Sequence, residues 1–170
     1  MKKLFILFLL IPVICFAQEC PRGSQNHIHK IFIVKRVIDG DTLLLNNGQK
    51  VRLIGLDTPE MHESDKLYRD AKRTKKDIKV IQAQGRLAYQ FTKSLVEGKA
   101  VSIEFDIEHY DKYGRLLAYV YLEDNTFINA KIIEEGYAQT MTIPPNVKHQ
   151  ELFLNLQKQA RENNRGLWKQ

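Results

Sequence analysis

Residues 39–60 read Asp-Gly-Asp-Thr-Leu-Leu-Leu-Asn-Asn-Gly-Gln-Lys-Val-Arg-Leu-Ile-Gly-Leu-Asp-Thr-Pro-Glu, and this stretch decides the fold. Two apolar-rich segments flank an Asn-Asn-Gly turn, a pattern that is typical of a β-hairpin. Because the strands of a hairpin are antiparallel, the second strand returns Asp57 and Glu60 to the end where Asp41 lies. The stretch therefore predicts three carboxylates at one end of a hairpin, with Arg52 projecting from the returning strand.

The chemistry of this end of the hairpin follows from its charges. Carboxylates that lie close together repel one another unless a cation neutralises them. Oxygen ligands of this kind suit Ca²⁺ or Mg²⁺. An arginine beside such a cluster indicates a bound phosphate, because the planar guanidinium can hold two phosphate oxygens at once.

Three motifs, in order along the chain, carry a resemblance to a known family. They are Asp-Gly-Asp-Thr at residues 39–42, Arg-Leu-Ile-Gly-Leu-Asp-Thr-Pro-Glu at 52–60 and Asp-Lys-Tyr-Gly-Arg at 111–115. Together they resemble the staphylococcal nuclease (thermonuclease) family over about residues 30–168. Taken singly, each motif could be an ordinary turn, strand-face ion pair or loop, and it is their order and spacing that make the match specific.

The resemblance implies a role for each matching position. It implies three catalytic residues, which are Arg52, Glu60 and Arg115. It implies that calcium is held by Asp41, Asp57 and the main-chain carbonyl of Thr58, and that Lys112 and Tyr113 contact the phosphate end of a nucleotide. One departure concerns the nucleotide pocket: where the family carries two tyrosines, this chain is expected to place Thr142 and Pro144.

The N-terminal residues predict export. Lys2 and Lys3 precede an apolar run from Leu4 to Phe16, and Ala17 ends an acceptable cleavage site, so residues 1–17 are predicted to be a signal peptide. The alternatives are an uncleaved anchor, for which the run is short of the about 20 residues that span a membrane, and a lipoprotein, for which the context of Cys15 is poor. Cleavage lowers the net charge from +6 by two, to +4, and leaves one cysteine, so packing alone must hold the domain together.

The remaining chain predicts an α+β protein. Residues 18–27 are expected to be a flexible segment before a single domain at 28–170, with strands at 28–38, 101–105 and 116–122 besides the hairpin. A helix is predicted at 82–97, where Ala83, Leu87, Phe91 and Leu95 recur every four residues and Ala88 and Val96 widen the apolar stripe. Further helices are predicted at 125–135 and 147–164. Residues 61–81 carry seven Lys and Arg and favour a solvated surface excursion, with some helix around Tyr68 to Arg73. The resemblance implies the specific architecture, an OB-fold five-stranded β-barrel with three helices.

These observations predict a calcium-dependent exported nuclease, secreted or periplasmic, that hydrolyses the phosphodiester bonds of DNA and RNA by metal-assisted attack of water. We expect a monomer with no lasting membrane association once the signal peptide is removed. The alternative is a non-catalytic OB-fold nucleic-acid-binding protein, and a third possibility is an envelope interaction protein with a vestigial site. Retention of Arg52, Glu60 and Arg115 together with both aspartates favours the nuclease.

Overall fold

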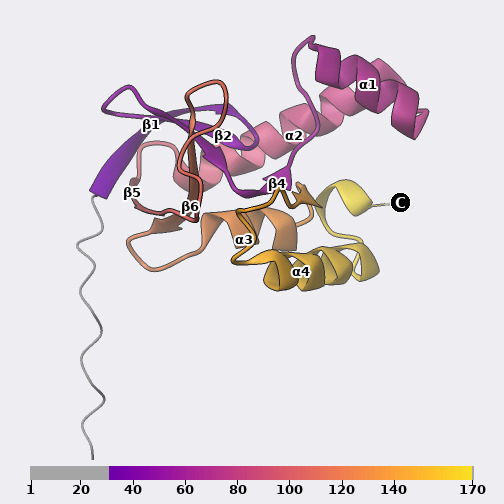
Figure 1. The fold of residues 1–170 in the computed structure, drawn as a ribbon. Coiled ribbons are helices and arrows are strands. Elements are labelled where there is room, and N and C mark those ends of the chain that lie inside the picture. Colours follow the sequence, from indigo (N-terminus) through magenta and orange to yellow (C-terminus); the bar gives the residue numbers. More distant parts are fainter. Residues whose placement is uncertain (1–30, 170) are drawn as a thin grey trace, which may run out of the picture.

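The structure, a computed structural model, describes residues 31–169. The predicted signal peptide and the segment 18–27 lie outside these residues. The first described strand opens a closed barrel whose strand order is β1-β2-β3-β6-β5 (Figure 1). Its strands are β1 (Ile31–Asp39), β2 (Thr42–Leu45), β3 (Lys50–Leu53), β5 (Ala100–Glu104) and β6 (Leu116–Leu122). The predicted five-stranded barrel is confirmed.

The hairpin of β2 and β3 has the predicted antiparallel pairing. Thr42 lies opposite Arg52, and Leu43 lies opposite Val51. Leu43 and Val51 are fully buried in the barrel core, whereas Arg52 points to the other face. Because β3 also pairs in parallel with β6, Arg52 is held between two neighbouring strands and not on a free edge.

The chain leaves the barrel at Gly55, a change of direction that the sequence did not predict. There it forms β4 (Gly55–Asp57), which pairs with β7 (Gln139–Met141) in a separate two-stranded sheet. Gly55 has φ +83°, and a Cβ at this position would lie 2.3 Å from the Phe153 ring, so only glycine fits without strain. This turn carries Asp57 from the barrel wall to the site described below.

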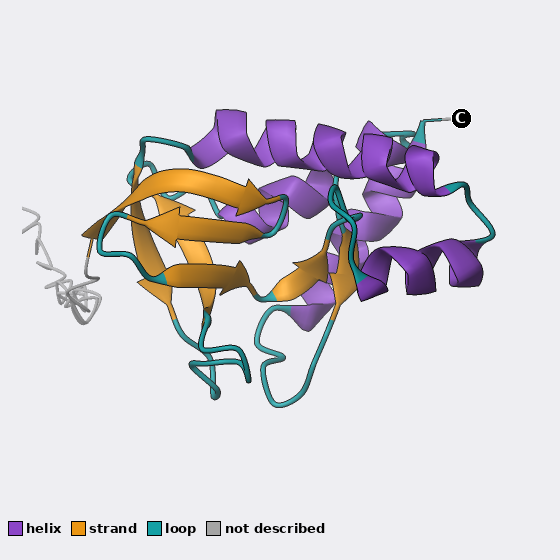
Figure 2. Ribbon diagram, turned by 90° about the horizontal axis from the view of Figure 1, so that it is seen from above, coloured by secondary structure: helices purple, strands orange, loops and turns teal. Residues whose placement is uncertain are grey.

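The described residues contain four α-helices where three were predicted (Figure 2). They are α1 (Asp65–Thr74), α2 (Ile78–Val96), α3 (Ile128–Glu134) and α4 (Gln150–Glu162), followed by a 3-10 turn at Gly166–Trp168. The segment 61–81 is mostly exposed, as expected, but it is more ordered than a surface excursion, because Ser64 caps α1 by accepting a hydrogen bond from the Leu67 amide and Leu67 is fully buried. None of the helices within residues 31–169 is long and apolar enough to cross a membrane.

Helix α2 covers the barrel with a face that overlaps the predicted one only in part, since Ala88 and Val96 are buried as expected and Phe91 and Leu95 are partly buried against the core. Its buried side is formed by Ile81, Gly85, Ala88, Thr92 and Val96. Leu87, which belonged to the predicted apolar stripe, is 50% exposed. The small residues on the buried side let α2 approach the segments that carry the site, and the Thr92 hydroxyl donates a hydrogen bond of 2.8 Å to the Gly40 carbonyl.

Candidate active site

Asp41 ties the start of the hairpin to the segment that follows β4. Its carboxylate is buried and accepts hydrogen bonds from the Thr42 hydroxyl at 2.9 Å, the Thr58 amide at 3.2 Å and the Thr58 hydroxyl at 3.1 Å. It also forms an ion pair with Arg52. The predicted approach of Asp41 and Thr58 is therefore present in the structure.

Arg52 joins the two predicted aspartates. One terminal nitrogen pairs with Asp41, and the other donates to Asp57 Oδ1 at 2.9 Å and to the Leu56 carbonyl at 3.3 Å. Its side chain is 17% exposed, so one edge of the guanidinium remains accessible. Burial lowers the pKa of Arg52 and the charge of Asp57 opposes that change, so the arginine remains a cation held between two carboxylates.

Lys66 is a site residue that the sequence analysis missed. From the first turn of α1 its ammonium donates to the Thr58 carbonyl at 2.9 Å and to Glu60 Oε1 at 2.9 Å, and it lies 3.1 Å from Asp57 Oδ1. Lys66 lies in a segment with many basic residues, and nothing in the sequence separated it from the solvent-exposed ones. The N-cap signal at Ser64 could have placed it on the first turn of a helix that starts just after Glu60.

Two of the predicted metal ligands, Asp57 and the Thr58 carbonyl, contact the Lys66 ammonium, whereas the third, Asp41, does not. Within the described part of the chain, no three or more His, Cys, Asp or Glu side chains gather closely enough to hold a metal ion. The carboxylates of Asp57 and Glu60 and the Thr58 carbonyl meet at Lys66, whereas Asp41 is engaged by Arg52 and Thr58. By chemistry the predicted ligands still suit Ca²⁺, because the carboxylates of Asp41 and Asp57 and the Thr58 carbonyl are the oxygen donors that this ion prefers.

Arg115 is oriented by Asp111, a second residue whose role the sequence analysis did not assign. The Arg115 Nε lies 2.7 Å from Asp111 Oδ2, and Asp111 Oδ1 accepts the main-chain amides of Arg115 and Tyr113 at 3.0 Å and 2.9 Å. Partial burial raises the pKa of Asp111, but the hydrogen bonds from Arg115 and Tyr113 outweigh it and hold that pKa below its usual value. The terminal nitrogens of Arg115 form no hydrogen bond or ion pair within residues 31–169, so they can bind a ligand.

These side chains border a cleft of about 310 Å³. It is lined by Ile38, Asp39, Asp41, Thr42, Lys50, Arg52, Glu60, Lys66 and Arg115. Burial raises the pKa of Asp39 above its ordinary value. The three residues predicted to be catalytic, Arg52, Glu60 and Arg115, therefore line one cleft.

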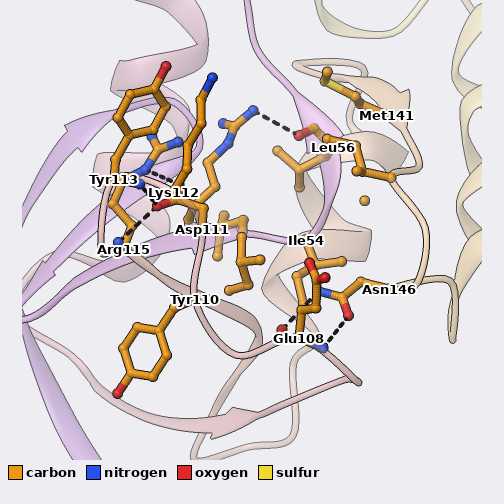
Figure 3. A pocket seen from close by; sticks show the side chains of 15 residues that line it. Ile54, Leu56, Glu108, Tyr110, Asp111, Lys112, Tyr113, Arg115, Met141 and Asn146 are labelled. Carbon is orange, nitrogen blue, oxygen red and sulfur yellow. Dashed lines mark hydrogen bonds and ion pairs between the residues drawn. The ribbon is translucent and has the colours of Figure 1, made fainter.

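A second pocket of about 440 Å³ adjoins the cleft, and Arg52 and Arg115 line both. Figure 3 shows the loop from Tyr110 to Arg115 on one side of it and Met141 with Asn146 on the other. Lys112 and Tyr113, the residues expected to contact a nucleotide, line this pocket, and Tyr113 is 73% exposed.

The opposite wall of this pocket corrects one expectation. Met141 and Ile143 line it, in place of the expected Thr142 and Pro144. Met141 belongs to β7, and residues alternate between the faces of a strand, so an offset of one residue reverses which side chains face the pocket. Met141 and Ile143 offer no aromatic ring on this side, and the tyrosines that line the pocket, Tyr110 and Tyr113, come from the loop on the other side.

The barrel topology and this cleft define an OB-type protein with paired arginines and carboxylates arranged for an anionic ligand. The sequence profile of the family described as "Staphylococcal nuclease homologue" matches residues 50–170. The chain belongs to this family, as its motifs predicted.

Curated relatives extend the match beyond the profile. A thermonuclease of Staphylococcus intermedius is 41% identical over 150 residues, which cover 86% of this chain and 81% of the relative. A thermonuclease of Staphylococcus hyicus is 36% identical, covering 86% and 80% of the two chains. Endonuclease YncB of Bacillus subtilis is 35% identical over 78% of this chain and 59% of its own length.

Proposed function

We propose that this protein is an exported, calcium-dependent nuclease that hydrolyses the phosphodiester bonds of DNA and RNA. The observation that carries the proposal is the shared cleft in which Arg52 and Arg115 lie with Glu60 and Asp41. The names of the relatives, thermonuclease and endonuclease, support the same class of activity. Export rests on the predicted signal peptide at residues 1–17, and we expect the mature protein to be a monomer.

The two arginines suit a phosphate in the cleft. A phosphodiester is an anion, and its hydrolysis adds negative charge around phosphorus as the nucleophile approaches. Positive donors that are held in place before the reaction stabilise that charge without reorganising. Arg52 is held by Asp41 and Asp57, and Arg115 by Asp111, so both guanidinium groups are oriented by carboxylates behind them.

Glu60 is the residue that would activate water. It follows Pro59, whose ring restricts the backbone, and its carboxylate lines the same cleft as both arginines. A carboxylate there can orient a water molecule and accept its proton as the oxygen attacks phosphorus. Lys112 and Tyr113, at the rim of the adjoining pocket, would contact the phosphate end of the nucleotide next to the cleaved bond.

The metal proposal concerns Asp41, Asp57 and the Thr58 carbonyl, which would hold Ca²⁺. When bound, the ion would supply positive charge that neutralises a phosphate oxygen. These oxygens suit calcium better than magnesium, because Mg²⁺ requires near-ideal octahedral geometry whereas Ca²⁺ tolerates irregular oxygen shells.

Removing calcium is therefore expected to abolish cleavage. Single-stranded and duplex DNA and an RNA would be incubated with the protein in Ca²⁺, in Mg²⁺ and in excess calcium chelator, and the products separated by size. We expect cleavage of all three substrates in Ca²⁺, weaker cleavage in Mg²⁺ and none in chelator. Undiminished cleavage in chelator would contradict the calcium assignment, and binding without cleavage in Ca²⁺ would favour a non-catalytic nucleic-acid-binding protein.

Gly85 is expected to position Glu60 through close packing. A Cβ at Gly85 would lie 2.6 Å from the Glu60 carbonyl carbon and 2.7 Å from the Pro59 oxygen, so Gly85→Ala must push this segment away from α2. A displacement of about 1 Å at a reacting group can lower the rate by about 10²-fold. Initial rates on duplex DNA would be compared with those of Gln90→Ala, an exposed position of α2. Equal rates in both variants would show that the contact does not position Glu60.

A further inference from the structure

Lys66 occupies the point at which two of the three proposed metal ligands, Asp57 and the Thr58 carbonyl, meet the carboxylate of Glu60. An ammonium group has three N–H donors, and here three oxygens from Asp57, Thr58 and Glu60 lie 2.9–3.1 Å from it. Two of these oxygens, from Asp57 and Thr58, belong to the set that would hold calcium. An ammonium and a divalent ion that contact the same carboxylate and the same carbonyl lie close enough to repel one another, so the two cations compete for this point.

The side chain of Lys66 also has another place to lie. It lines both the active-site cleft and a groove of about 360 Å³ along α1, where Arg69, Arg73 and Met141 are among its neighbours. The lysine is 26% exposed, and its four-carbon stem bends readily, so the ammonium can leave the carboxylates without unfolding α1.

We propose that Lys66 is a tethered competitor of the divalent cation, an inference that rests on the proposed metal site. In the absence of metal its ammonium neutralises Asp57 and Glu60 and holds the segment between β4 and α1 together. Metal binding displaces it toward the groove along α1. The apparent Kd for Ca²⁺ is then the intrinsic Kd divided by the fraction of molecules in which the ammonium has left.

A purely structural role for Lys66 would change the affinity for Ca²⁺ in the opposite direction. If Lys66 only braced the carboxylates and kept its place with metal bound, its removal would loosen the ligands and weaken Ca²⁺ binding. Competition predicts tighter binding from the same substitution. The direction of the change in Kd therefore separates the two roles.

The experiment measures binding of Ca²⁺ alone to the full-length mature protein by isothermal titration calorimetry, without nucleic acid. The variants are Lys66→Met, which keeps the length of the apolar stem, and Lys66→Gln, which keeps hydrogen-bond donors without the charge. Lys72→Met is the matched control, because Lys72 is exposed on the same helix. Thermal unfolding in chelator and in saturating Ca²⁺ provides a second readout for all four proteins.

We expect the apparent Kd for Ca²⁺ to fall by about tenfold in Lys66→Met, the change produced when the competent fraction rises from about a tenth to nearly all molecules. The apparent Kd should also fall in Lys66→Gln, and the Kd of Lys72→Met should equal that of the parent. In chelator both Lys66 variants should melt below the parent, and Ca²⁺ should raise their melting temperatures more than it raises that of the parent.

An unchanged or higher Kd in both Lys66 variants would overturn the competition while leaving the calcium site intact. Absence of Ca²⁺ binding in the parent and in every variant would instead overturn the proposed metal site itself. The two failures are therefore distinguishable in one set of titrations.

Discussion

Replacing Arg52 with lysine is expected to lower the rate of phosphodiester hydrolysis by about 10²–10³-fold, the usual cost of losing one preorganised transition-state donor. The substitution keeps the positive charge but removes the planar fork. In the structure that fork contacts Asp41 with one nitrogen and Asp57 and the Leu56 carbonyl with the other. A lysine ammonium is a single point and cannot hold both carboxylates and a phosphate.

The matched control for Arg52→Lys is Arg86→Lys, an exposed position on α2. Single-turnover rates on duplex DNA would be measured at saturating Ca²⁺, with circular dichroism to show that the barrel is folded. Arg115→Lys should be impaired by a similar factor, because a lysine cannot keep the Nε contact with Asp111 that aims the guanidinium. Near-normal turnover in both variants with the fold intact would place the reactive phosphate elsewhere.

The hairpin was predictable because its signals are local. An Asn-Asn-Gly turn between apolar segments specifies antiparallel pairing, and pairing of Thr42 with Arg52 follows directly. The closeness of Asp41 to Thr58 depends on more than that register, because the chain turns at Gly55 and β4 pairs with β7 before Thr58 is reached. The sequence brought the two ends of the hairpin together but did not reveal this turn.

Lys66 and Gly85 could not be assigned in this way, because their roles depend on how helices pack on the hairpin. In sequence, Lys66 is one of seven basic residues in 61–81, and only the capped α1 directs its side chain back to Glu60. Gly85 lies within a regular helix, and its lack of a side chain becomes meaningful only where the Glu60 backbone touches it. Charge runs and helical glycines carry too little local information to reveal such contacts.

The predicted face of α2 was incomplete for a related reason. Ala88 and Val96 are buried as expected, yet Leu87 is half exposed and the close contact also uses small residues outside the predicted stripe. Hydrophobic periodicity finds the side of a helix that can be buried. It does not find the side that allows the closest approach of another backbone, which is what the site required here.

The second large effect is expected from Glu60→Gln, which should lower hydrolysis by about 10²–10⁴-fold, the range attributed to general acid–base catalysis. The amide has almost the same shape as the carboxylate, and its oxygen can still accept the hydrogen bond that Lys66 donates to Glu60. The segment after Pro59 should therefore keep its position. What the amide loses is the ability to take a proton from water.

Binding must be measured separately from hydrolysis to test this role. Affinity for a short, fluorescently labelled single-stranded DNA would be determined in Ca²⁺ by anisotropy at protein concentrations and times at which the variant does not cleave. Glu63→Gln is the control, since Glu63 is exposed three residues away and undergoes the same chemical change. Glu60→Gln should bind as the control does while its rate of hydrolysis falls. If binding and hydrolysis fell together, Glu60 would act through the metal or the fold, and another group would have to activate the water.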